Sequence, residues 1–266
     1  MAKVSGGALA ARVMKTHGID HLFGIIGGHV YPIFEACEAE DMRVIDVRHE
    51  ESGAHMAEGW ALTTGRPAAC IGTAGPGFTN MLTGVANAYA GSSPLLAIGG
   101  RATLQQFDTR ALQDFNQIDI VKPMTKYARS IFETERIPEY FDTAIHHAIH
   151  GRPGPVYLET PMDRLFAEVD DADLAMPTST GASSLPAGNP DDIERAVELI
   201  DRAERPVVVA GAGVWWAQAQ EELKAFVERA DLPLFTRAAG RGCVPDDHPL
   251  CIAAGIPANP VTGKAL

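Results

Sequence analysis

Short apolar runs alternate with amphipathic segments along the first 160 or so residues of the chain. Apolar positions at helical spacing in ALAARVMKTHG, residues 8–18, predict a helix that ends at Gly18, and the run HLFGIIG predicts a strand after it. The alternation continues with helices expected at 31–40, at 50–64 and after the GPG of 75–77, and with strands at 43–47, 67–73 and 94–100. This pattern is typical of a parallel sheet covered by helices on both faces.

A polar stretch at 101–119 interrupts the pattern, which resumes with a helix near 137–150 and the strand PVYLE at 155–159. The expected fold class of residues 1–166 is therefore α/β, with a doubly wound parallel sheet. Residues 167–189 are rich in Asp, Ser, Pro and Gly and lack an apolar period, which predicts a linker. Residues 190–266 offer only three or so strand-sized segments, and the tail 255–266 contains no closing helix, so we expect a second, incomplete α/β domain.

Composition narrows the classes of partner. The chain has 34 acidic and 22 basic residues, and its formal net charge of -12 disfavours binding to phosphate backbones and anionic lipid surfaces. The four cysteines stand at no metal-ligand spacing, which indicates buried thiols in a reducing compartment. Since the sequence shows neither a signal peptide nor an apolar run of about 18 residues, we expect a cytoplasmic protein that binds neither nucleic acid nor a membrane.

Three loops follow predicted strands at the edge where parallel sheets usually bind ligands. They are GIIGGHV with Gly27, Gly28 and His29, DVRHE with Glu50, and GTAGPGFTN at 72–80. Each loop also has an ordinary structural explanation. Paired glycines form plain turns, a first-turn acid such as Glu50 complements a helix dipole, and a lone histidine is a common polar loop residue. Taken singly, no loop identifies a function.

The order of these loops along the chain matches a known family. The chain resembles the pyrimidine-binding domain of thiamine-diphosphate-dependent enzymes in the segments GIIGGHVYPIFEAC, VIDVRHEESGAHMAEGWA, GTAGPGFTNMLTGVANAYAGSSPLLAIGG, ALQDFNQIDIVKPMTKYA and GRPGPVYLETPMD. The most similar group comprises acetolactate synthase, benzaldehyde lyase and 2-hydroxyacyl-CoA lyase. The resemblance covers residues 3–166, and the segment from Pro190 resembles the start of the family's central domain. The family's third domain, whose Gly-Asp-Gly motif and downstream Asn hold magnesium and diphosphate, has no recognisable counterpart in the sequence.

The resemblance implies a catalytic role for three residues. Glu50 stands where a family glutamate hydrogen-bonds a ring nitrogen of the aminopyrimidine and favours the imino tautomer, which removes the proton from the thiazolium carbon. Gln113 matches a glutamine on the substrate side of the cofactor. His29 matches the benzaldehyde lyase type, in which a histidine can move protons to and from a 2-hydroxy ketone adduct. The residues implied to bind the cofactor, besides Glu50, are Gly27, Gly28, Thr73, Pro76, Gly77 and Asn80.

Other motifs lie outside these roles. The turn VAGAGVWW resembles part of a dinucleotide-binding motif, and some relatives bind FAD, but its glycine spacing is incomplete, so FAD is left open. Trp215 and Trp216 are expected to serve packing or an interface. His146, His147 and His150 have spacings of three and four that could bind metal, but without a nearby carboxylate pattern a solvated helix face is favoured, and no metal ligand is predicted.

The expected function is the pyrimidine-binding component of a thiamine-diphosphate-dependent carbon-carbon lyase or carboligase that acts on 2-keto acids or 2-hydroxy ketones. Its Mg²⁺ ligands are expected on another domain or chain, so we expect a homodimer, a homotetramer or a complementary chain, and no turnover by this chain alone. The alternative is a non-catalytic split or truncated paralogue that acts as a binding or assembly module. A plain nucleotide-binding Rossmann protein fits the alternation but leaves RHE, GPG and LQD unexplained.

Overall fold

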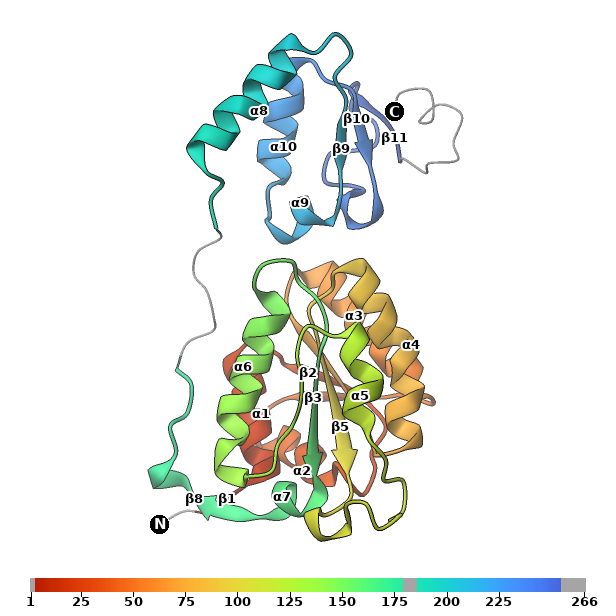
Figure 1. Ribbon diagram of the computed structural model, residues 1–266, viewed down its shortest axis with the longest axis vertical. Helices are drawn as coiled ribbons and strands as arrows, with labels where there is room; N and C mark the ends of the chain where they lie inside the picture. The colour runs from red at the N-terminus through yellow and green to blue at the C-terminus, as the bar shows by residue number, and fades with distance from the viewer. Residues whose placement is uncertain (1–2, 179–185, 255–266) are drawn as a thin grey trace. The chain divides into compact units, whose positions relative to one another are not determined.

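The computed structural model describes residues 3–178 and 186–254 and divides the chain into two compact units after residue 182 (Figure 1). Each unit contains a parallel sheet of its own, so each is described by itself. Residues 179–185 of the expected linker and the tail 255–266 lie outside the described residues.

The first unit is built on a six-stranded parallel sheet. Its strands are β2 (His21–Gly24), β3 (Arg43–Asp46), β4 (Ala68–Gly72), β5 (Leu95–Arg101), β6 (Ala128–Ser130) and β7 (Val156–Pro161). They pair side by side in the order β3-β2-β4-β5-β7-β6, and every pairing is parallel. The expected parallel α/β sheet is confirmed.

Helices cover both faces of this sheet. They are α1 (Gly6–Thr16), α2 (Tyr31–Ala39), α3 (Glu50–Thr64), α4 (Pro76–Gly91), α5 (Gln117–Val121), α6 (Ile137–Ile149) and α7 (Met162–Phe166). Short 3-10 turns add η1 (Leu104–Gln106), η2 (Lys122–Met124), η3 (Thr134–Arg136) and η4 (Asp171–Asp173). Figure 1 shows α1 and α6 on one side of the strands and α3 and α4 on the other. One large apolar core joins α1, α2 and α6 to the sheet.

Several short elements were not predicted from the sequence. Strand β1 (Lys3–Ser5) pairs antiparallel with β8 (Glu168–Asp170), and Val4 lies opposite Val169. Strand β8 falls inside the segment expected to be a linker, and Leu174, further along, packs against the first core. Such three-residue strands, like β6 in the first sheet, are too short to show a period in the sequence, so only their pairing reveals them.

Helix α3 shows how the local sequence sets the boundaries of an element. His49 has an extended backbone and its Nδ1 accepts a hydrogen bond of 3.3 Å from the backbone N–H of Glu51. Glu50 and Glu51 occupy the first turn, where acidic side chains complement the helix dipole. Gly65 ends the helix in a left-handed conformation with φ 69°, which glycine adopts without steric cost. The expected helix 50–64 closed by Gly65 is confirmed.

Small residues let α3 and α4 approach each other closely. Gly53, Ala54, Ala57 and Ala61, which share one face of α3, are all buried. A side chain on Gly84 of α4 would collide with the Cβ of Ala54. This contact sets how closely the two helices pack against each other.

The second unit contains a three-stranded parallel sheet in the order β11-β10-β9. Its elements are α8 (Pro190–Arg202), β9 (Val208–Ala210), α9 (Ala212–Trp216), α10 (Gln220–Ala230), β10 (Leu234–Thr236), η5 (Ala238–Gly240) and β11 (Cys251–Ala254). Buried Leu234, Val227 and Val244 lie in its small core. Helix α8 keeps Ile193, Val197 and Leu199 exposed. No helix among the described residues combines the length and the apolar character needed to cross a membrane.

Candidate active site

The carboxyl ends of β2, β3, β4 and β5 lie at one edge of the first sheet because these strands run parallel. The segments that follow them are 25–30, 47–49, 73–75 and 102–116. Together with the first turns of α3 and α4, these segments contain every site residue that the sequence analysis singled out. The contacts below show how far the fold brings these residues together.

Glu50 is the first residue of α3, and its carboxylate reaches α4. Asn80 Nδ2 donates a hydrogen bond of 2.9 Å to Glu50 Oε2. Glu50 Oε1 lies 3.4 Å from the position that a Cβ on Gly77 would take, so glycine at this place keeps the space beside the oxygen open. Asn80 is the one hydrogen-bond partner of the carboxylate within the described residues, and Glu50 is half-buried. Oε1 is therefore available to a ligand group that carries a proton.

Thr73 joins the loop after β4 to the loop after β2. Its Oγ1 is hydrogen-bonded to His29 Nδ1 at 2.9 Å, and a Cβ on Gly27 would lie only 2.6 Å from Thr73 Cβ. Burial lowers the pKa of His29 below its ordinary value of 6.5, and the negative charge of Asp114 opposes this shift. Near neutral pH the ring is therefore mainly uncharged, and its Nδ1 either donates to the Thr73 hydroxyl or accepts from it, according to which ring nitrogen carries the proton.

Gln113 belongs to the same edge through the glycine loop after β4. Gln113 has a left-handed backbone with φ 63°, and Gly75 has φ 66°. A Cβ on Gly75 would lie 2.7 Å from Gln113 Cβ, so only glycine permits this approach. Gly28 has open space where a side chain would stand, and Pro76 is exposed as the first residue of α4.

The buried side chain of Gln117 holds the glycine loop at this edge of the sheet, and the sequence analysis did not predict this role. Its buried amide oxygen accepts a hydrogen bond of 3.1 Å from the backbone N–H of Gly75. Its Nε2 donates to the backbone oxygen of Gly100 at 3.0 Å and to Glu159 Oε2 at 2.8 Å. One side chain therefore ties the glycine loop to the ends of β5 and β7. The sequence offered no signal for it, since a glutamine in a polar stretch reads as a surface residue.

A buried ion pair continues this network. Arg101 Nη1 donates to Glu159 Oε1 at 2.6 Å, and Arg101 Nε donates to Asp114 Oδ1 at 3.2 Å. Burial alone would lower the pKa of Arg101, but the two carboxylates outweigh it and raise that pKa above its ordinary value. Glu159 is fully buried, and an acid inside the apolar strand VYLETP was the one sequence signal for such a partner.

The geometry fits a flat heterocycle that needs a carboxylate at one edge. Glu50 offers an oxygen beside Gly77. A Cβ added to Gly77 would lie 2.9 Å from Thr73 Cγ2, so Thr73 borders the same space. His29 reaches the same threonine from the other side. Glu50, Asn80, Gly77, Thr73, His29 and Gly27 therefore form one continuous group. The structure also places Gln113 next to this group through Gly75.

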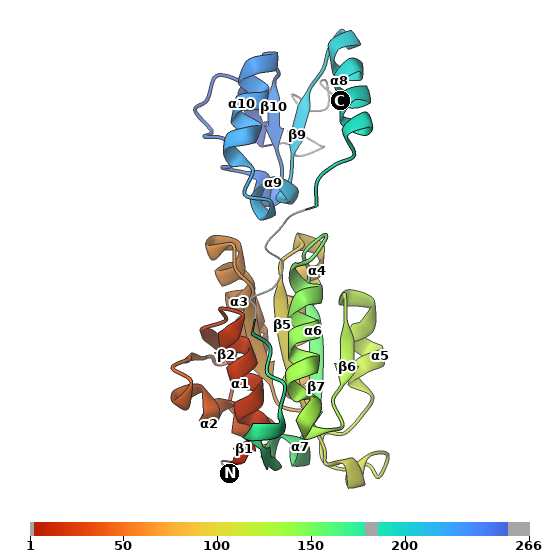
Figure 2. The same ribbon diagram turned by 90° about the vertical axis from the view of Figure 1, so that its left-hand side faces the viewer.

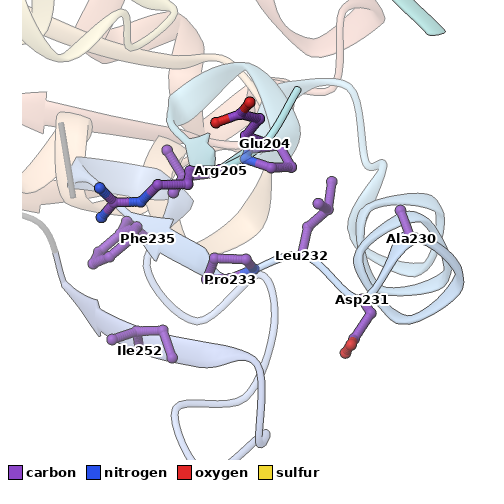
Figure 3. Close-up of a pocket in the computed structure, with 10 residues that line it drawn as sticks. Glu204, Arg205, Ala230, Asp231, Leu232, Pro233, Phe235 and Ile252 are labelled. Atoms are coloured by element: carbon purple, nitrogen blue, oxygen red, sulfur yellow. The ribbon is translucent and has the colours of Figure 1, made fainter. Parts of the chain in front are cut away.

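The glycine turn of the second unit lies between β9 and α9, at the carboxyl end of its strand. Side chains on Gly211 or Gly213 would meet open space, and α9 has only 5 residues. A hollow of about 600 Å³ lies elsewhere, before the amino ends of β9 and β10, and its lining includes Arg205, Pro233 and Ile252 (Figure 3). Among the described residues, this hollow and the glycine turn are therefore two separate features of the second unit. Trp215 and Trp216 are half-buried in α9.

Family models match segments of both units. Residues 4–120 match the model described as thiamine pyrophosphate enzyme, N-terminal TPP binding domain. Residues 193–265 match the model described as thiamine pyrophosphate enzyme, central domain. The first match includes all the residues of the group around Glu50 and Thr73, and also Gln113.

Curated relatives are similar over most of this chain. A probable acetolactate synthase large subunit from Methanocaldococcus jannaschii is 36% identical over 94% of this chain and 43% of its own length. An acetolactate synthase large subunit from Mycobacterium tuberculosis is 36% identical over 93% of this chain and 45% of its own. A glyoxylate carboligase from Escherichia coli O157:H7 is 38% identical over 94% of this chain and 42% of its own. The chain thus spans less than half the length of these relatives.

Proposed function

We propose that the first unit of this chain, which belongs to the thiamine pyrophosphate enzyme family, holds the aminopyrimidine part of thiamine diphosphate. We assign this role to residues 1–166, a linker to 167–189 and part of the central domain to 190–266. The observation that carries the proposal is the placement of Glu50 Oε1 beside Gly77, while Asn80 holds the other carboxylate oxygen. The family is enzymatic, and the relatives of this chain include acetolactate synthases and a carboligase.

The proposed activity is that of a carbon-carbon lyase or carboligase of the acetolactate synthase type, with 2-keto acids or 2-hydroxy ketones as substrates. When bound, thiamine diphosphate supplies the nucleophilic carbon for this chemistry. Glu50 holds a proton at a ring nitrogen of the aminopyrimidine, and Asn80 keeps the carboxylate in place by its hydrogen bond of 2.9 Å. The glycines at 27, 28 and 77 let the ring approach the backbone.

His29 and Gln113 are proposed to act on the substrate side. Thr73 fixes the ring of His29 by the hydrogen bond at Nδ1, which leaves Nε2 to give or take a proton. Burial lowers the pKa of His29, so the neutral form predominates near neutral pH; it acts as a base at Nε2 in the tautomer whose Nδ1–H donates to Thr73 Oγ1. The Gln113 side chain offers an amide that can donate to a substrate oxygen.

A partner surface is proposed to close this site. Apolar side chains next to the site residues are exposed, namely Ile26 at 56% and Leu112 at 78%. We infer that a partner covers these two side chains, because an apolar surface beside a ligand site is a common place for an interface. We place the ligands for Mg²⁺ and diphosphate on another domain or chain that covers this edge, in a homodimer, a homotetramer or a complementary complex.

The assembly can be tested by light scattering of the purified chain at high micromolar concentration. Leu112→Glu should weaken self-association or capture of a diphosphate-binding family domain. Leu199→Glu, on the equally exposed surface of α8, is the control and should not. A monomer that captures no such domain contradicts the proposed assembly.

Proton transfer can be tested in a protein that fuses this chain to the diphosphate-binding domain of a relative. Glu50→Gln should slow exchange of the thiazolium carbon proton by roughly 10²- to 10⁴-fold, the usual contribution of a positioned proton-transfer group. Glu51→Gln is the matched control, because it lies one residue further and about 100° around the helix. His29→Ala should leave the exchange rate unchanged and slow a later step. Equal exchange in Glu50→Gln and the parent would refute the proposal.

Two further expectations belong to the proposal. The purified chain with thiamine diphosphate and Mg²⁺ should not consume pyruvate, and steady consumption would contradict the placement of the missing ligands on a partner. If the fusion with a diphosphate-binding domain assembles but shows neither proton exchange nor turnover, the alternative of a non-catalytic binding module gains support. FAD in the second unit and a cytoplasmic location both stay predictions, and a flavin absorption spectrum of the purified protein tests the first.

A further inference from the structure

A cluster of histidines and one aspartate lies at the opposite edge of the first sheet. His17 follows α1 and comes just before β2, while Asp142 and His146 belong to α6, whose end leads into β7. Both connections lead into the starts of parallel strands, so the cluster lies at the amino edge, across the sheet from Glu50. Figures 1 and 2 both show α1 and α6 side by side.

The cluster is partly built into the interior. His17 is 6% exposed, and its Nε2 lies 2.7 Å from Asp142 Oδ1. Its other ring nitrogen is buried without a hydrogen-bond partner among the described residues, so Asp142 alone orients the ring. The buried imidazole of His17 has a desolvation cost, and packing by itself does not explain its place beside the partly exposed carboxylate of Asp142.

The spacing of the donor atoms suits a metal ion. One ligand atom from each of His17, Asp142 and His146 lies within 4.8 Å of the other two. The Oδ1 atom of Asp142 lies 3.7 Å from Nε2 of His146 and 2.7 Å from Nε2 of His17. Bonds of about 2.1 Å in a tetrahedral zinc site separate neighbouring ligand atoms by roughly 3.4 Å, so Asp142 must move slightly away from His17 and towards His146 when an ion binds.

A fourth ligand is near at hand. The ring of His150, one turn after His146, has its centroid 5.0 Å from that of His146. A hollow of about 300 Å³ opens beside them and is lined by Asp142, Thr143, His146, His147 and His150, so an ion can enter from solvent. The sequence analysis favoured a solvated helix face for these histidines because it recognised no carboxylate near them. The structure shows such a carboxylate, since Asp142 lies one turn before His146, and it brings His17, the residue after α1, next to both.

We propose that His17, Asp142 and His146 form a binding site for a divalent transition metal ion, with Zn²⁺ as the ion that two imidazoles and a carboxylate suit best. His150 or water completes the coordination. Binding breaks the hydrogen bond between His17 Nε2 and Asp142 Oδ1, because the ion takes the place of the proton on Nε2 and the ring then carries its proton on Nδ1. The ion joins the end of α1 to α6, so the site is structural and separate from the proposed thiamine diphosphate site.

Isothermal titration of the full chain with ZnCl₂ tests the proposal, using protein freed of any polyhistidine tag and stripped with a chelator. We expect about one ion per chain at this site. At a free Zn²⁺ concentration of 100 times Kd, the melting temperature should rise by roughly 5 to 10 °C.

Matched variants identify the ligands. His146→Gln should weaken Zn²⁺ binding at least about tenfold, since even outer-shell partners of a metal contribute on the order of 10- to 100-fold. His147→Gln is the control, because His147 lines the same hollow but stacks on Tyr127 and lies outside the donor group. Asp142→Asn keeps the size of the side chain but removes a charged donor oxygen, so it should also weaken Zn²⁺ binding. Absence of Zn²⁺ binding, or equal affinity in the parent and in His146→Gln, overturns the proposal.

Discussion

Removing the side chain of Gln117 should strongly destabilise the first unit. Gln117→Ala leaves three buried groups without their partner, namely the N–H of Gly75, the backbone oxygen of Gly100 and Oε2 of Glu159. An unpaired buried polar group costs about 1–3 kcal/mol, and Glu159 keeps its bonds to Arg101 and Ser130, so we expect a total loss of roughly 3–5 kcal/mol. This is a large part of the stability of an ordinary domain, which is about 5–15 kcal/mol.

The measurement is urea unfolding followed by tryptophan fluorescence in a Trp215→Phe/Trp216→Phe background. The chain has 3 tryptophans, so Trp60, which contacts His21 in the first unit, becomes the single reporter. Gln105→Ala, in an exposed turn of the same polar stretch, is the control and should change stability by less than about 0.5 kcal/mol. Hydrogen exchange at the Gly75 amide should accelerate in Gln117→Ala alone. A loss below about 1 kcal/mol would refute the reasoning, because it would mean that these groups find other partners.

Three further predictions concern packing, thiols and pH. Gly84→Ala should lower the unfolding free energy by roughly 1–3 kcal/mol because the new methyl group meets α3, whereas Gly59→Ala, which faces open space, should raise it by about 0.5–1 kcal/mol in the same urea assay. Burial raises the pKa of Cys70 to about 12 and that of Cys37 to about 11, so a thiol reagent should label both only after unfolding, and rapid labelling of the native protein would contradict this. Burial lowers the pKa of His29 below 6.5, so the unfolded chain binds a proton at this residue more readily than the folded protein. The folded protein therefore loses stability as the pH falls below 6.5. His29→Gln should flatten the fall in melting temperature between about pH 7 and 5.

The local sequence was sufficient for the main helices and strands. The start of α3 at Glu50 and its end at Gly65 follow from an N-cap, first-turn acids and a glycine that adopts a positive φ, all within a few residues of each other. The parallel sheet followed from short apolar runs that alternate with helical periods. These signals are local, so one sequence is enough to read them.

The tertiary structure decided which distant groups meet. Gln117 and Glu159 are 42 residues apart and His17 and Asp142 are 125 apart, and no local period links either pair. The small strands β6 and β8 also exist only through their partners. The roles of Glu50 and His29 came from resemblance, and the fold adds the contacts through Asn80 and Thr73 that orient them. Backbone propensity and periodicity act over a few residues, whereas a buried polar contact is set by packing across the whole sheet, and a single sequence does not display it.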